Sequence, residues 1–73
     1  MESLNCKEIF KERLKELIAE KGLNHQTLSD LTGIPRTSIS NWVNGRRTPQ
    51  MEALVQLALF FKVSTDYLLG LEN

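Results

Sequence analysis

Residues 36–41 place four polar side chains at the spacing of one helix face, and these side chains can pair with nucleic-acid bases. The four are Arg36, Thr37, Ser40 and Asn41, and the helical period brings them to the side away from the apolar residues. An arginine at a helix start can bridge O6 and N7 of guanine, and an asparagine can pair with adenine in the same two-point way. We therefore expect base contacts from this face, with Arg36 and Asn41 as the main readers.

The turn that follows this face carries groups that bind phosphate. Asn44 and Gly45 form a strong turn signal, and Arg46 and Arg47 come directly after it. Amides and guanidinium groups in such a loop hydrogen-bond to phosphate oxygens and position a protein on a duplex. We expect phosphate contacts from Asn44, Arg46 and Arg47.

A second expected phosphate site is the start of the preceding short helix. Asn24 can cap this helix, and His25 and Gln26 stand in its first turn. The unpaired N–H groups and the positive dipole end of a helix start attract anions. We therefore add His25 and Gln26 to the expected phosphate contacts. Because imidazole titrates near neutral pH, a contact from His25 would also depend on pH.

Apolar spacing and capping residues predict five helices that hold these groups in place. Glu8 follows an asparagine by three residues, which matches the logic of a capping box. Proline suits a first helical turn, so Pro35 should lie inside the start of the third helix. The expected caps are Asn5, Asn24 and Ser64, and the expected helix ends are Gly22, Gly33 and Gly70. The predicted helices cover about 6–21, 25 to 31 or 32, 35–44, 50 or 51 to 60 or 61, and 65–69, with no strand and no repeat.

Length and composition indicate one small globular domain. The 73 residues are 41% hydrophobic and 25% charged, which allows one core and argues against a disordered chain. We expect a single domain over 1–73 with its ordered core over about 6–70. Cys6 is the lone cysteine, so a reducing cytoplasm fits best. No apolar run approaches the roughly 20 residues that cross a bilayer, so no membrane contact is expected.

The sequence offers no constellation of residues for catalysis. It lacks a Ser-His-Asp set, a carboxylate pair in an apolar setting and a glycine-rich phosphate loop. It also lacks a cluster of cysteine and histidine with metal-ligand spacing. We expect no enzyme activity, no cofactor and no metal.

Charge is balanced overall but unevenly placed. The formal net charge is zero, which is unusual for a nucleic-acid binder. Residues 22–49 hold three arginines against one aspartate, and residues 50–73 hold one lysine against three acidic residues. The basic surplus therefore coincides with the segment that carries the expected base and phosphate contacts.

Six sequence pieces stand in one register across most of the chain. They are RLKEL at 13–17, EKGLN at 20–24, LSDLTG at 28–33, SISNW at 38–42, NGRRTP at 44–49 and VSTDYLLG at 63–70. With these pieces, the segment from about Phe10 to Gly70 resembles the helix-turn-helix domain of the Cro and phage-repressor regulators. In that motif two helices cross at roughly 90–120° over a short turn. This crossing needs a small residue, a glycine and apolar side chains, which are Ser29, Gly33, Leu28, Ile34, Ile39 and Trp42 here.

The resemblance implies an all-α, lambda-repressor-like five-helix bundle whose third helix enters the major groove of DNA. The implied function is a sequence-specific transcription regulator, and we expect a repressor that occupies an operator. A single domain of this size reads few base pairs, so we expect a homodimer on half-sites about one helical turn apart. Its self-contact is expected around the last helix, at Val63, Tyr67 and Leu71.

The chain departs from the family pattern at four positions. Ile18 and Val43 stand where the family has an internal Arg–Glu pair, and an apolar contact can replace such a pair without loss of stability. His25 stands where many members have a glutamine that touches phosphate. Pro35 replaces a serine or threonine cap.

A protein-interaction module is the alternative function. The same fold could act as an antitoxin that covers a toxin, and the neutral net charge keeps this reading open. Titration against random duplex DNA at low salt separates the two, because a DNA reader retains nonspecific affinity there.

Overall fold

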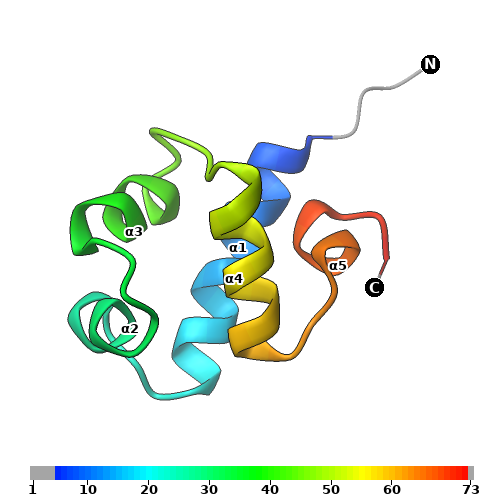
Figure 1. Ribbon diagram of the computed structural model, residues 1–73. Helices are drawn as coiled ribbons and strands as arrows, with labels where there is room; N and C mark the ends of the chain where they lie inside the picture. The colour runs from blue at the N-terminus through cyan, green and yellow to red at the C-terminus, as the bar shows by residue number, and fades with distance from the viewer. Residues whose placement is uncertain (1–4, 73) are drawn as a thin grey trace.

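The computed structural model describes residues 5–72, and within them every regular element is a helix (Figure 1). The prediction of an all-α fold with five helices is confirmed. The helices are α1 (Cys6–Glu20), α2 (His25–Thr32), α3 (Arg36–Val43), α4 (Met51–Phe61) and α5 (Thr65–Leu69).

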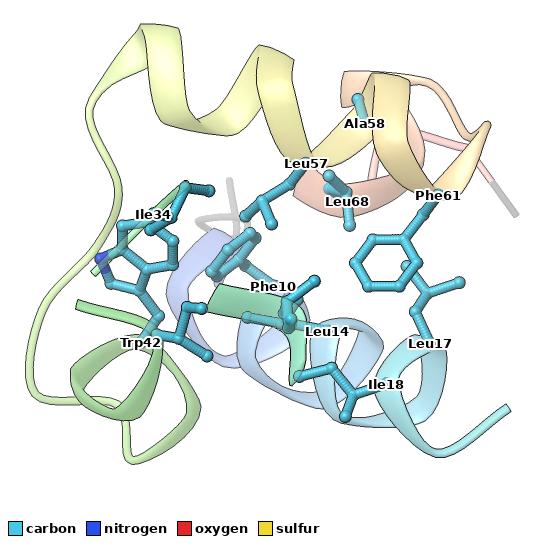
Figure 2. Close-up of a cluster of buried hydrophobic side chains, with 12 residues drawn as sticks. Phe10, Leu14, Leu17, Ile18, Ile34, Trp42, Leu57, Ala58, Phe61 and Leu68 are labelled. Carbon is cyan, nitrogen blue, oxygen red and sulfur yellow. The ribbon is translucent and has the colours of Figure 1, made fainter. Parts of the chain in front are cut away.

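The helices surround one core. In Figure 1, α4 crosses in front of α1, the pair α2 and α3 lies on one flank, and α5 lies on the other. Figure 2 shows Phe10 and Leu14 of α1 pointing toward Leu57 of α4 and Leu68 of α5. The pair α2 and α3 therefore packs against one side of α1 and α4, which together we call the body.

Each of the five helices contributes one completely buried side chain to this core. These side chains have no exposed surface, and they are Leu14, Leu28, Ile39, Leu57 and Leu68. The expected apolar residues of the two-helix crossing are buried as well, with Ile34 at 6% and Trp42 at 7% exposure. Ile18 is in the core, and Val43 packs against it half-buried. The recognition helix α3 is thus fixed to the body by close packing.

The three capping residues predicted from the sequence, Asn5, Asn24 and Ser64, are the N-caps of α1, α2 and α5. Asn24 accepts a hydrogen bond from Thr27 N (2.8 Å), and the Thr27 hydroxyl accepts one from Asn24 N (2.9 Å). Ser64 accepts from Tyr67 N at 3.0 Å. At α1 only half of the expected capping box forms, because Asn5 accepts from Glu8 N (3.3 Å) while the Glu8 carboxylate pairs with Lys11 (3.0 Å).

The prediction that Pro35 lies inside the first turn of α3 is wrong. Pro35 is the N-cap residue, with φ −57° and ψ 138°, and α3 begins at Arg36. The fixed φ of proline suits both helical and extended backbone, so the ψ angle decides whether the residue belongs to the helix. The ψ of Pro35 is that of extended backbone. The Pro35 carbonyl accepts hydrogen bonds from Ser38 N (3.0 Å) and Ile39 N (3.2 Å), which starts the helix without a side-chain cap.

Replacing Asn24 by alanine should lower the free energy of unfolding by about 1 kcal/mol, because it removes the side-chain oxygen that accepts from Thr27 N, while the backbone N–H of residue 24 can still donate to the Thr27 hydroxyl. The melting temperature should fall by about 4–8 °C for a domain of this size. Asn5→Ala is the matched control, since it removes a single longer bond at the start of α1. Equal losses in thermal melts of the two variants would contradict the importance given to the α2 cap.

Candidate nucleic-acid interface

The four predicted base readers lie on the solvent side of α3. Arg36 and Thr37 are exposed, and Ser40 and Asn41 are half-buried. The opposite side of the helix holds the core residue Ile39, which has no exposed surface. The orientation predicted from the helical period is therefore confirmed, while the base contacts themselves stay a prediction.

The end of α3 brings the predicted phosphate residues next to the base readers. Asn44 is the C-cap, and Gly45 adopts a left-handed backbone with φ 76°. Gly45 N donates to Trp42 O at 3.2 Å, and Arg46 N donates to Asn41 O at 2.9 Å. These two hydrogen bonds form the Schellman motif, which fixes the chain direction after a helix. Arg46 and Arg47, both exposed, thus leave the end of the recognition helix along a defined path.

Lys11 of α1 lies beside this turn, although no sequence pattern predicts this. A Cβ placed on Gly45 would lie 3.3 Å from Lys11 Cδ, so the lysine side chain runs against the turn. The side chain of Lys11 is only 22% exposed. A hydrogen bond from Lys11 to Glu8, and the Glu8 charge, raise the pKa of the ammonium group. Lys11 is therefore a third cation beside the turn that carries Arg46 and Arg47, which we call the arginine turn.

The turn between α2 and α3 is held by polar groups that the sequence also did not reveal. The Thr32 hydroxyl donates to Leu28 O (2.7 Å) and accepts from Ile34 N (3.2 Å). Gly33 ends α2 with φ 78°. Gln56 of α4 donates its side-chain amide to Thr32 O, which ties the turn to the body. These bonds set the angle at which α3 leaves α2.

The two other predicted phosphate residues, His25 and Gln26, lie in the first turn of α2 and not in the turn after α3. His25 is half-buried and Gln26 is exposed. The Gln26 amide donates to Asp30 Oδ1 at 2.9 Å, along its own helix. Among the residues that the structure describes, no hydrogen bond joins either side chain to α3. The Gln26 amide has a second N–H that the bond to Asp30 leaves free, so both residues can still donate to a phosphate.

Two further properties follow from the described part of the chain. No group of three or more His, Cys, Asp and Glu side chains in residues 5–72 is arranged to hold a metal ion. None of the described helices is both long and apolar enough to span a membrane.

Comparison with known proteins gives the same picture. The helix-turn-helix family matches residues 14–68. The chain is 38% identical over 88% of its length to the HTH-type transcriptional activator BcrR of Enterococcus faecalis, of which the match covers 31%. It is 39% identical over 85% of its length to the HTH-type transcriptional regulator AnsR of Bacillus subtilis, of which the match covers 53%. A prophage-derived uncharacterized regulator of Bacillus subtilis, YonR, is 36% identical over 84% of this chain and 56% of its own.

The chain therefore spans between about a third and just over half of these relatives. No solved structure matches it. The family match covers the two-helix crossing, the arginine turn and most of the core. The expectation that the chain is not an enzyme agrees with this family and with the names of the relatives. The chain belongs to the helix-turn-helix family of the Cro and phage-repressor type.

Proposed function

We propose that this protein is a sequence-specific DNA-binding transcription regulator that places α3 in the major groove. The observation that carries the proposal is a recognition helix fixed by buried Ile39 and Trp42, with polar side chains on its free side. Side chains on a rigid helix can be held at base edges without a large loss of conformational entropy on binding. Family membership supports the same conclusion.

The proposed contacts divide into base readout and phosphate positioning. Arg36 and Asn41 read guanine and adenine, and Thr37 and Ser40 contribute a methyl, hydroxyl or water-mediated contact. Phosphate positioning comes from two places, the turn after α3 and the start of α2. The residues proposed for it are His25, Gln26, Asn44, Arg46 and Arg47.

We further propose a homodimer that represses transcription from the cytoplasm by occupying an operator. A palindromic operator lets two copies combine their base contacts, with half-sites about one helical turn apart. The sign of regulation needs a test of its own, because the relative BcrR is named an activator. Expression of a reporter placed behind a selected operator measures the sign: a fall on adding the protein supports repression, and a rise contradicts it.

Arg47→Ala should weaken binding to all duplex sequences by a similar factor, because a phosphate contact carries no base information. The slope of log K against log salt should flatten by about one unit. Arg47→Lys keeps the charge and should keep the slope, which makes it the matched control. A loss confined to one operator sequence would instead show that Arg47 reads a base.

A protein-interaction module remains the second candidate, since the formal net charge is zero. Titration of the wild-type chain with random duplex DNA at low salt separates the two functions. Measurable binding that falls steeply with added salt supports the DNA reader. Absence of binding at low salt would favour an antitoxin or adaptor that binds a protein partner.

A further inference from the structure

The outer face of α4 carries an apolar stripe. Met51, Val55 and Leu59 stand four residues apart, and they are 78%, 48% and 74% exposed. Four-residue spacing lines side chains up along one side of a helix. The opposite side of α4 is in the core, through Leu57 and Phe61 among others (Figure 2).

The helix is thus apolar on both sides, which is the pattern of a helix covered on both sides. Only two other large apolar side chains are strongly exposed in residues 5–72, Leu31 at 60% and Leu71 at 63%. They stand singly on other segments, and single exposed apolar residues need no explanation. The α4 stripe alone forms a row.

We propose that this stripe binds the same stripe of a second copy of the chain, with the two α4 helices antiparallel. The proposal rests on the homodimer of the proposed function and names its surface. The formal net charge of zero means that two copies do not repel each other as whole molecules. The specific argument for a second copy is the charge at the two ends of the stripe.

An antiparallel twofold contact pairs apolar with apolar and acid with base in one register. If the dyad crosses α4 at the level of Leu57, Val55 of one copy lies level with Leu59 of the other. The same register brings Glu52, in the first turn, level with Lys62 of the second copy, at the C-cap. Both residues are exposed. A parallel pairing would instead place Glu52 of one copy beside Glu52 of the other, and the two negative charges would repel each other.

The arrangement is also compatible with DNA reading. In Figure 1 the outer face of α4 points away from α1, and α2 and α3 lie on the flank beside it. The dyad of an antiparallel helix pair runs across α4 within the contact plane. A rotation about it leaves both α3 helices on the same side of the dimer, as binding to one face of a duplex requires.

At the surface around α5 predicted from the sequence, Arg13 of the same chain already covers the ring of Tyr67. The Arg13 guanidinium lies 4.3 Å from the centroid of the Tyr67 ring. Arg13 also donates hydrogen bonds to Tyr67 O and to Glu72 O, the latter at 2.6 Å. A partner at this place would have to displace these contacts.

Three side chains per copy form a contact well below the roughly 800 Å² per partner of a standard interface. Self-association in the absence of DNA should therefore be weak. Occupation of two half-sites on one duplex raises the effective concentration of the second copy. The contact should consequently appear most clearly as cooperativity between half-sites.

Leu59→Glu tests the surface, and Leu71→Glu is the matched control at the alternative surface. Sedimentation of the free proteins over a concentration series measures self-association, and binding to duplexes with one or two half-sites measures cooperativity. Leu59→Glu should weaken both by about tenfold or more while leaving single half-site affinity unchanged, since a buried unpaired carboxylate opposes the contact. Loss with Leu71→Glu and not with Leu59→Glu would overturn the proposal.

Charge reversal tests the antiparallel register. Glu52→Lys and Lys62→Glu should each weaken self-association, and the double variant should restore it, because both end pairs are rebuilt with reversed polarity. Circular dichroism checks that each variant is folded. Failure of the double variant to recover would overturn the register.

Sedimentation needs no DNA, so it tests the contact separately from the DNA function. A wild-type chain that dimerises through α4 and binds no duplex would refute the DNA function while sustaining this contact.

Discussion

Leu57→Ala is expected to lower the free energy of unfolding by about 2–5 kcal/mol, the cost of an unfilled space in a packed core. Leu57 has no exposed surface, and it faces Phe10 and Leu68 across the centre of the molecule (Figure 2). A small domain has a total stability of only about 5–15 kcal/mol. Denaturant titration should thus show a much earlier midpoint, and DNA binding should be lost wherever the variant unfolds.

Leu59→Ala is the control for this change, because it makes the same substitution two residues later in the same helix. Leu59 is 74% exposed, so its truncation should change stability by no more than about 0.5 kcal/mol in dilute protein. Similar losses for the two variants would show that α4 does not pack against the core through Leu57.

Arg36→Ala is expected to abolish discrimination at one base pair of each half-site, at a cost of about 1–3 kcal/mol for the preferred sequence. The reason is that an exposed arginine in the first turn of α3 can make a two-point contact with guanine. Competition among operator variants, each changed at a single position, measures the effect. The affinity for the other variants should fall far less.

Arg36→Lys and Arg47→Ala separate readout from general attraction. Arg36→Lys keeps the charge and loses the planar fork, so it should also relax specificity. Arg47→Ala should keep specificity and weaken every sequence alike. If Arg36→Ala still discriminated at every position as the wild type does, Arg36 would not be a base reader.

Local signals in the sequence were sufficient for the order and type of the helices. The caps at Asn24 and Ser64 and the helix ends at Gly33 and Gly70 are short-range features, and all four are confirmed. Each is a bond or a backbone angle decided by residues within one turn of the chain. The same is true of the polar side of α3, since the helical period turns Arg36, Thr37, Ser40 and Asn41 away from the side that buries Ile39 and Trp42.

Features that depend on distant residues could not be predicted. The side chain of Lys11 runs against Gly45 and so joins α1 to the arginine turn. The bond from Gln56 to the Thr32 carbonyl likewise joins α4 to α2. Neither pair has a spacing signal, because only the packed tertiary fold brings the partners together. Pro35 was misplaced by one residue because the sequence fixes φ for a proline and leaves ψ open.

The exposed apolar side of α4 could not be predicted from the sequence pattern alone. The inward residues from Ala53 to Phe61 account for one side of the helix. The exposure of Met51, Val55 and Leu59 becomes visible only once the core is known to be filled without them. The stripe then requires a separate explanation.

Selection from a random duplex pool tests the central claim most directly, namely that α3 reads DNA sequence. The wild-type chain should enrich one motif, in two inverted half-sites whose centres are about one helical turn apart. The same selection with Arg36→Ala should return the motif with one position per half-site randomised. Recovery of no motif by a folded wild-type chain would contradict the claim that this helix is a sequence reader.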